Sequence, residues 1–419
     1  MAGAWSTTYP SRGHAAIVFI TLSELNVTKD TQSLLINPCQ HNIVGLDPRG
    51  VKPSGSVVDC WPKFPEGRAQ FETLYYPGIS NGSSTAIGTQ FSAADIFGTA
   101  CTTTVGGSNG TAAFVGTPAV VRDMLTYIKV EKAETRKFEA KLWYYGHGLR
   151  YGTVLGATTA HLFPDHVDRI ILDGVVDAED YYNLGWESNL YDPDKAIDSF
   201  IHSCYDAASV QNIGSRLDTL LEDLNPLKSF PNLGNVLSSL ELGDTTAYAT
   251  AVTSGATTAN PCNYAISGSA STRTKVINTL IKCLDGYRGG KLENVHQFKN
   301  YTDILNSQSE SFGEVWQNNA NGVTCRSFEV TAPKTGRLDD INRPILDTRH
   351  TANPILFITT EIDLVSPKRG AHKMSSIFPG SVILIQGSVG HTAFASASTC
   401  VLLAANVTCQ PDAEPFRAP

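Results

Sequence analysis

The stretch Leu142-Trp-Tyr-Tyr-Gly-His-Gly-Leu-Arg-Tyr-Gly-Thr-Val-Leu-Gly156 passes from an apolar run through closely spaced glycines into a helical pattern. Aromatic and aliphatic residues at its start favour a buried strand. The glycines that follow permit a sharp turn. In parallel α/β proteins, the carboxyl end of such a strand is where side chains reach a ligand. The stretch therefore predicts an α/β fold with a functional site at this turn.

Short apolar runs of strand length recur on both sides of this stretch. Helical patterns separate them, and between residues 117 and 132 apolar residues return every three or four positions. Such alternation is typical of βαβ units around a parallel sheet. We expect an α/β fold with a mostly parallel central sheet flanked by helices. The predicted strands are residues 15–20, 33–36, 42–46, 141–145, 169–172, 354–359 and 381–385.

The strand pattern is absent from residues 181–343. Amphipathic stretches at 196–207 and 213–224 predict helices, and the Thr, Ala, Ser and Gly composition of residues 245–272 indicates a flexible connection. We therefore expect a core of residues 1–180 and 344–419 with an inserted, mainly helical cap at residues 181–343. Because ligands bind beyond the carboxyl ends of parallel strands, such a cap predicts a small-molecule pocket between core and cap.

The composition restricts the partners of the chain. Of its 419 residues 42% are apolar and 17% are charged, as in globular proteins, and no apolar run reaches the roughly 20 residues of a membrane span. A net charge of −8 offers no basic surface to nucleic acid. The sequence lacks phosphate-loop, dinucleotide-binding, HExxH and EF-hand motifs, so we expect no cofactor and no metal. A monomer or homodimer that binds a small molecule is the expected form.

The nine cysteines lack the paired spacing of a zinc site, which leaves disulfides or buried thiols. Cys400 and Cys409 are close enough in sequence for a local disulfide. Together with the sequons, the cysteines predict a glycoprotein of the secretory pathway or the extracellular space. The first residues show no signal-peptide pattern, so a cytoplasmic location is the alternative. The sequons begin at Asn26, Asn81, Asn109, Asn300 and Asn406.

Several motifs along nearly the whole chain resemble one family, least closely in the predicted cap. They are similar to the tripeptidyl-aminopeptidase-like, or prolyl-aminopeptidase-type, α/β-hydrolases. The resemblance implies a Tyr-Gly-x-Ser-Tyr-Gly-Thr nucleophile turn and an early glycine-rich loop that binds the oxyanion. The matching segments are Asp47-Pro-Arg-Gly50, Gly116-Thr-Pro-Ala-Val-Val-Arg-Asp123, Leu142 to Ala157, Phe163-Pro-Asp165, Arg169, Leu172 to Tyr182 and Asn353-Pro-Ile-Leu-Phe357.

The chain departs from this family at two points. In the G-x-S-x-G frame, Arg150 occupies the position of the nucleophilic serine, and the turn is two residues longer, through His147 and its neighbours. A guanidinium cannot attack a carbonyl, because it stays protonated. The glycine-rich oxyanion loop is also missing, since Ile36-Asn-Pro38 runs directly into the segment from Cys39 to Asp47. Losing the attacking group and the oxyanion donors argues against ordinary serine peptidase activity.

Two members of a catalytic triad remain. Asp363 follows the strand predicted at 354–359, and His391 follows the strand predicted at 381–385, in the chain order that this fold uses. A carboxylate that orients an imidazole makes a general acid or base even without a serine. Arg150 either fills the vestigial site or binds a substrate oxygen. His147 is either a second proton-transfer group or a structural residue of the turn.

The predicted function is a cofactor-independent, non-hydrolytic enzyme: a lyase, isomerase or cyclase acting on a small, largely apolar metabolite, as in secondary metabolism. His391 would move the proton and Asp363 would orient it, while Tyr151 and Leu149 would contact the substrate. The first alternative is a residual hydrolase, in which His391 activates water or a displaced serine such as Ser366 or Ser388. The second alternative is a catalytically inactive binding protein.

Other polar residues are expected to have structural roles. Asp47 and Arg49 are interpreted as residues that hold loops together. Asp173 and Asp177, which follow a predicted strand, would fix the entry to the cap. The histidines of the helix after the glycine turn, His161 and His166, are expected at the surface.

Overall fold

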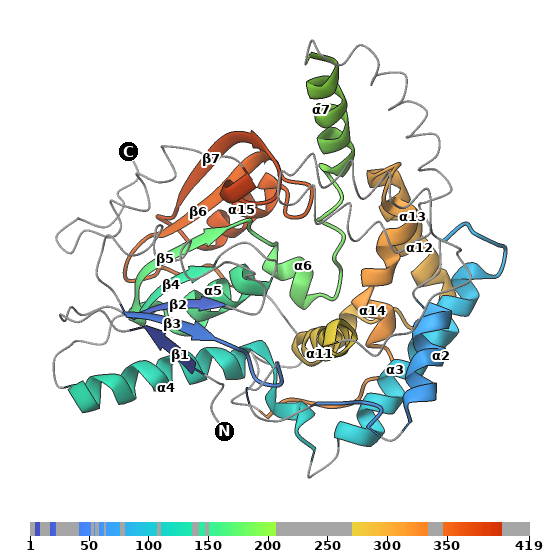
Figure 1. Ribbon diagram of the computed structural model, residues 1–419, viewed down its shortest axis with the longest axis horizontal. Helices are drawn as coiled ribbons and strands as arrows, with labels where there is room; N and C mark the ends of the chain where they lie inside the picture. Colours follow the sequence, from blue (N-terminus) through green and yellow to red (C-terminus); the bar gives the residue numbers. More distant parts are fainter. Residues whose placement is uncertain are drawn as a thin grey trace.

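A computed structural model describes most of the chain as a parallel sheet with flanking helices and a second group of helices beside them. Figure 1 shows the sheet with α4, α5 and α15 on one side of the molecule, and α2, α3 and α11–α14 on the other. The described residues are 5–8, 17–21, 42–51, 54, 58–62, 64–75, 80–106, 110–135, 142–146, 151–206, 270–333 and 347–395.

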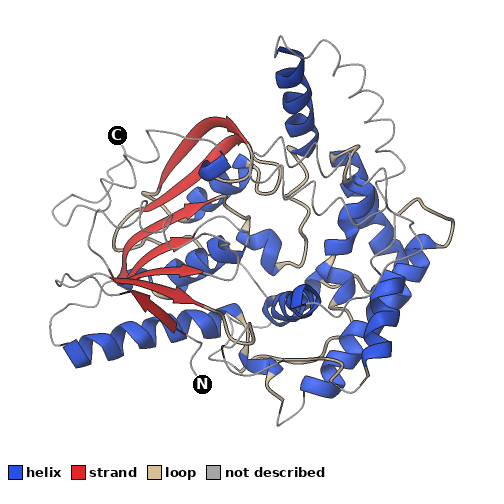
Figure 2. Cartoon of the chain, in the orientation of Figure 1, coloured by secondary structure: helices blue, strands red, loops and turns tan. Residues whose placement is uncertain are grey.

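The described part of the chain contains a seven-stranded sheet in the order β1-β3-β2-β4-β5-β6-β7 (Figure 2). All neighbouring strands are parallel except β1, which runs antiparallel to β3 at the edge. Parallel neighbours bring the carboxyl ends of β4, β5, β6 and β7 to one edge of the sheet. The strands are Trp5–Thr8, Ile17–Thr21, Asn42–Leu46, Leu142–Gly146, Val167–Asp173, Ile355–Ile362 and Val382–Val389.

The central strands are apolar because helices bury them. α4 (Thr117–Thr135), α5 (Tyr151–Leu162) and α15 (Lys368–Ile377) share one core with side chains from β4, β5 and β6. Helix α5 lies especially close to the sheet. A Cβ added at Gly156 would lie 2.4 Å from a methyl carbon of Leu172 and 2.7 Å from the Tyr144 ring. This close contact fixes the position of α5, the helix that follows β4.

The remaining helices form a separate core, which we call the helical layer. Its aromatic residues include Trp61, Phe71 and Phe97, whose rings pack against each other, and the buried Phe298 and Trp316. The helices of this layer are α2 (Pro65–Tyr75), α3 (Ala86–Val105), α11 (Ala270–Asp285), α12 (Val295–Gln308), α13 (Gly313–Trp316) and α14 (Asn321–Thr324).

Two further helices follow β5 in the chain. α6 (Ala178–Tyr182) begins just beyond β5, and α7 (Pro193–Asp206) follows it. Among the described residues, no helix is both long and apolar enough to cross a membrane. The 3₁₀ turns are Ala112–Phe114, Pro164–His166, Arg288–Gly290, Gln317–Asn319 and Ala393–Ala395.

The predicted elements agree with the structure in type, and their ends differ by a few residues. Six of the predicted strands are observed, and the helix predicted at 117–132 is α4. The antiparallel edge strand β1 was missed, and so was α11, which begins within the stretch interpreted as a connection. The segments 33–36 and 213–224 lie outside the described residues. Helices α2 and α3 of the helical layer come from residues before 181, and the domain limits at 181 and 343 stay a prediction.

Two disulfides lie inside the helical layer. Cys60 bonds to Cys101 of α3, and Cys283 of α11 bonds to Cys325, which directly follows α14. Disulfides persist in oxidising compartments, so both fit a secreted or extracellular protein. The pair predicted between Cys400 and Cys409 lies outside the described residues. Occupancy of the sequons stays a prediction.

Removing either disulfide should lower the free energy of unfolding by about 2–4 kcal/mol, because the bond restricts the unfolded chain. The sequence separations are 42 residues for Cys283–Cys325 and 41 for Cys60–Cys101, so the two losses should be similar. Urea denaturation of the Cys283→Ser/Cys325→Ser and Cys60→Ser/Cys101→Ser variants measures both. A reduced wild-type protein as stable as the oxidised one would contradict the expectation.

Candidate active site

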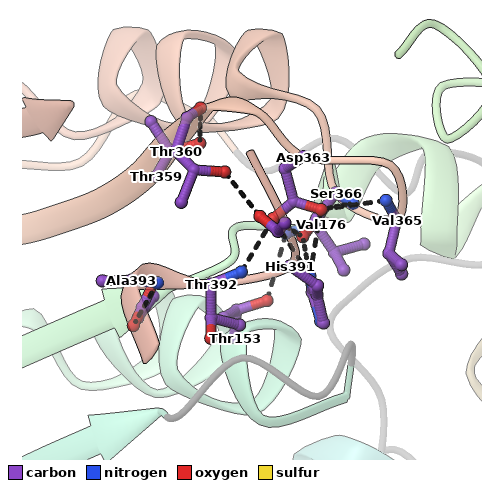
Figure 3. A network of polar contacts seen from close by, with 12 residues as sticks. Thr153, Val176, Thr359, Thr360, Asp363, Val365, Ser366, His391, Thr392 and Ala393 are labelled. Atoms are coloured by element: carbon purple, nitrogen blue, oxygen red, sulfur yellow. Dashed lines mark hydrogen bonds and ion pairs between the residues drawn. The ribbon is translucent and has the colours of Figure 1, made fainter. Parts of the chain in front are cut away.

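A buried histidine and aspartate meet where β6 and β7 end. Asp363 directly follows β6, and His391 lies in the loop after β7. The Nδ1 atom of His391 is 3.0 Å from each carboxylate oxygen of Asp363 (Figure 3). The exposed fractions of the two side chains are 1% and 0%. The two residues that were predicted to form a dyad are therefore in direct contact.

Backbone donors converge on the carboxylate of Asp363. The N–H groups of Val365 and Ser366 donate to Oδ1 at 2.9 and 2.8 Å, and that of Thr392 donates to Oδ2 at 3.2 Å. Burial by itself would raise the pKa of Asp363. The charge of His391, its hydrogen bond and the backbone donors outweigh burial and lower that pKa below its ordinary value. Asp363 is thus an ionised carboxylate that orients the imidazole through Nδ1.

The loop that carries His391 has an unusual backbone. Thr392 has φ = 69°, in the left-handed region that a β-branched residue rarely adopts, and Gly390 has φ = 128°. Hydrogen bonds hold this conformation: the Gly390 N–H donates to Ile362 O at 2.9 Å, and the Thr360 hydroxyl donates to Gly390 O at 2.7 Å. Strained backbone that the surroundings over-determine is common at functional sites.

Gly174, the residue after β5, leaves room for the imidazole of His391 because it has no side chain. Gly174 has φ = 69°, and a Cβ added there would lie 2.9 Å from His391 Cε1, 2.9 Å from the Thr392 methyl group and 3.2 Å from the Ser366 hydroxyl. Three strand ends therefore pack tightly at this point, and only glycine fits.

The hydroxyl of Ser366 is bonded to both members of the dyad. It lies 3.1 Å from His391 Nδ1 and donates to Asp363 Oδ2 at 3.1 Å. A serine nucleophile must instead face Nε2, because Nδ1 is occupied by the orienting carboxylate. Ser366 is also buried, so its position is that of a support for Asp363. The other serine considered as a displaced nucleophile, Ser388, lies on β7, and its hydroxyl accepts from Gln386.

The glycine turn after β4 is only partly described. β4 ends at Gly146 and α5 begins at Tyr151, and β4 is a neighbour of β5 in the sheet. His147, Leu149 and Arg150 lie outside the described residues, so their predicted roles stay predictions. Because parallel strands end at the same edge, this turn and the His391 loop follow strands that end on the same side of the sheet.

Tyr151 belongs to a partly buried polar network between the core and the helical layer. Its hydroxyl is 2.8 Å from that of Thr117 at the start of α4. The Thr117 hydroxyl also donates to Asp285, the last residue of α11, and the Thr117 N–H donates to the same carboxylate at 2.8 Å. Tyr181 of α6 donates to it at 2.9 Å. A substrate contact for Tyr151 stays a prediction.

Asp285 in this network was not singled out from the sequence. Burial raises its pKa to about 7, although hydrogen bonds from Thr117 and Tyr181 act in the opposite direction. Its hydrogen-bond partners come from two other elements, α4 and α6, so no local pattern around residue 285 marks it. The carboxyl group joins the end of α11 to the start of α4 and to α6, and Tyr151 in the same network is the first residue of α5.

The structural roles predicted for other polar residues agree with the structure in some cases and not in others. Arg49 donates to both carboxylate oxygens of Asp123 on α4, at 2.5 and 2.6 Å, which confirms that it joins a loop to a helix. Asp177 caps α6 by accepting from the Glu179 and Asp180 N–H groups. The expectation for His161 was wrong, because α5 turns this residue into the interior, whereas His166 is exposed.

Asp173 has a contact that its sequence position did not indicate. It lies fully buried and accepts from the Ala393 N–H in the loop of His391, and its expected role at the entry to the helices that follow β5 stays a prediction. The expectation considered only the neighbours of Asp173 in sequence, whereas its partner lies 220 residues away.

A cavity of about 850 Å³ lies on the helical layer, between α3 and α12. Its lining consists of Ser80, Thr85, Ser92, His296 and their neighbours, and includes neither Asp363 nor His391. The pocket expected between core and cap stays a prediction. Among the described residues, no group of three or more His, Cys, Asp or Glu side chains is placed to hold a metal ion.

Substituting Gly174→Ala should destabilise the protein by about 1–3 kcal/mol, because the new methyl group meets His391 and the backbone has positive φ. Thermal denaturation measures the loss, and the NMR signal of the His391 ring should shift because the ring must move. Gly380→Ala is a matched control. Gly380 also has a positive φ, of 85°, but the space around its Cβ position is open. Equal effects of the two substitutions on the His391 signal would contradict the close contact.

Substituting Asp285→Asn should flatten the pH dependence of stability. The folded-state pKa of about 7 lies above the ordinary value of Asp, so the native state keeps its proton to higher pH than the unfolded chain. The free energy of unfolding must therefore fall as pH rises from about 4 to about 7, and asparagine removes this part of the decline.

Melting temperatures at pH 5 and pH 8 test the role of Asp285. The wild-type protein should lose more stability across this interval than the Asp285→Asn variant. Asp303→Asn removes an exposed carboxylate of α12 and should leave the decline unchanged. Parallel declines in the wild type and Asp285→Asn would show that Asp285 keeps an ordinary pKa.

Comparison with known proteins relates the chain to one family. A search of curated proteins gives no match. The family described as "TAP-like protein" matches residues 309–406, a stretch that contains β6, β7, Asp363 and His391 but not residue 150. The matched stretch is similar to this family, and the match supports the resemblance to the tripeptidyl-aminopeptidase-like α/β-hydrolases that the sequence predicts.

Proposed function

We propose that this protein is a cofactor-independent enzyme that transfers protons on a small, largely apolar substrate without hydrolysing it. The observation that carries the proposal is the buried contact between His391 Nδ1 and both oxygens of Asp363. The charge of His391, its hydrogen bond and backbone donors keep that carboxylate ionised. At the turn after β4, the sequence has Arg150 in the frame of the missing serine. In this proposal, His391 remains as the base, while the serine that would accept an acyl group is replaced by Arg150.

In the proposed reaction, His391 Nε2 removes a proton from a carbon beside a carbonyl group of the substrate. The electron pair of the broken C–H bond moves toward the carbonyl oxygen, and Asp363 stabilises the imidazolium that forms. The imidazolium then returns the proton to another carbon or to a leaving group, whose bond electrons leave with it. The sequence of steps consumes no oxidant, reductant or water. It covers isomerisation and elimination. In ring closure, the electron pair freed by proton removal instead forms a bond to a second carbonyl carbon of the same substrate, and the imidazolium gives its proton to the oxygen of that carbonyl group.

The residues of the glycine turn have proposed supporting roles. Arg150 or His147 would hold the substrate oxygen on which negative charge develops, because a guanidinium offers several fixed donors. Leu149 and Tyr151 would contact the apolar part of the substrate. The substrate would bind between the core and the helices at residues 181–343.

A residual hydrolase is the second candidate, and the match to a hydrolase family favours it. In that case His391 would activate water directly. Ser366 is a poor nucleophile for this purpose, because its hydroxyl donates to Asp363 on the Nδ1 side of the ring. Hydrolysis without a serine would also have to proceed without the glycine-rich oxyanion loop that the sequence lacks.

Proton removal can be measured without knowing the physiological product. Incubation with a panel of small cyclic and aliphatic ketones in D₂O should lead to deuterium incorporation at carbons beside the carbonyl, detected by mass spectrometry. His391→Ala should lower this exchange by about 100- to 10,000-fold, as expected for loss of a general base. Asp363→Asn should lower it as well, because the ring loses the carboxylate that orients it.

The same protein preparation separates the alternatives. Ester hydrolysis that depends on His391, with no deuterium exchange in the ketones, would support the residual hydrolase and contradict the proposal. Ser366→Ala is the matched control, since it removes a hydroxyl next to the dyad without removing the base. Exchange that survives in His391→Ala would exclude this mechanism. Absence of both activities would favour a binding protein.

A further inference from the structure

The buried Asp173 is not used by the proposed mechanism. It is the last residue of β5, with an exposed fraction of 0%. Its two carboxylate oxygens lie 3.0 and 3.2 Å from the N atom of Ala393, which donates to them. Ala393 is two residues beyond His391, in the same strained loop. Asp173 therefore holds the histidine loop from the strand next to β6.

The ionisable groups that interact with Asp173 are the two members of the dyad. Burial raises the pKa of Asp173 to about 7, while the Ala393 hydrogen bond and the charge of His391 lower it. The negative charge of Asp363 raises it, and the Gly174 N–H lowers it slightly. Asp363 comes from the end of β6, and His391 comes from the loop after β7. A second carboxyl group thus interacts with the imidazole from the β5 side.

We infer that Asp173 is a positioning residue for His391, which anchors the histidine loop through Ala393 and adds a second carboxylate to the surroundings of the imidazole. This inference rests on the proposed function, because it assumes that His391 exchanges a proton. Its geometric basis is independent: the Ala393 N–H donates to Asp173, and a Cβ added at Gly174, the neighbour of Asp173, would lie only 2.9 Å from His391 Cε1, so the end of β5 packs closely against the ring.

A second carboxylate has a consequence that a purely structural anchor lacks. An ionised Asp173 stabilises the imidazolium form of His391, and an imidazolium favours ionisation of Asp173. The two groups therefore titrate as a coupled pair. Asparagine at position 173 keeps an oxygen that accepts from the Ala393 N–H but removes the charge. The substitution Asp173→Asn separates the electrostatic role from the anchoring role.

Histidine NMR on the full-length protein tests the inference without a substrate. Selective ¹³C labelling at Cε1 gives signals for the ten histidines, and His391→Asn identifies the signal of residue 391. The titration midpoint of His391 should fall by about one pH unit or more in Asp173→Asn, as expected for loss of a nearby buried charge. Asp177→Asn is the matched control. Asp177 follows the same strand and caps α6, and asparagine caps helices equally well.

The variant Asp363→Asn distinguishes the inference from the function on which it rests. If Asp363→Asn lowers the midpoint of His391 and Asp173→Asn does not, the inference is overturned and the dyad stands. If neither substitution moves the midpoint, the proposed dyad itself fails. A shift in Asp177→Asn equal to that in Asp173→Asn would also overturn the inference, because it would show a nonspecific effect.

Carboxyl titration covers the case in which Asp173→Asn does not fold. In an Asp285→Asn background, which removes the other aspartate of the described residues whose pKa is raised to about 7, ¹³C-labelled aspartate should show the carboxyl group of Asp173 titrating near pH 7. Its midpoint should rise when His391→Asn is added, because the imidazolium charge is lost. Absence of such a carboxyl group, or a midpoint that does not respond to His391→Asn, would overturn the inference.

Discussion

The contact between His391 Nδ1 and the carboxylate of Asp363 determines how the end of the sheet is built. Both oxygens lie 3.0 Å from the ring nitrogen, in a site that excludes solvent. A buried charge is costly unless hydrogen bonds compensate it. The chain meets this requirement with backbone N–H groups of Val365, Ser366 and Thr392. The left-handed backbone at Thr392 is thereby tied to the same carboxylate.

Three aspartates, of which Asp173 and Asp363 are fully buried and Asp285 is partly buried, have different roles because their surroundings differ. Asp363 has a charged partner and several donors, so its pKa is lowered. Asp173 is equally buried and Asp285 is partly buried, but in both the effect of burial outweighs the hydrogen bonds and raises the pKa to about 7. Asp173 acts at the dyad, and Asp285 acts where the helical layer meets the core. Proton uptake at neutral pH is thus linked both to the candidate site and to the contact between the two layers.

The sequence-based predictions agree best with the structure where they rest on neighbouring residues in the chain. The strands at β4, β5, β6 and β7 were predicted from their apolar runs, and Asp363 and His391 were found because each follows such a strand. β1 was missed because Trp5–Thr8 is short and antiparallel. His161 was placed at the surface because its helix has small and apolar residues on all sides, so the pattern did not identify a solvent-facing side.

The sequence by itself determined the α/β class, the order of strand, acid and histidine, and the arginine in the serine frame, because these depend on residue type and on spacing along the chain. Only the tertiary structure decided that Asp173 contacts the histidine loop, that Asp285 joins α11 to α4 and α6, and that the cysteines pair as Cys60–Cys101 and Cys283–Cys325. Each of these contacts joins residues at least 41 positions apart. Their chemistry depends on burial and on partners that folding alone brings together.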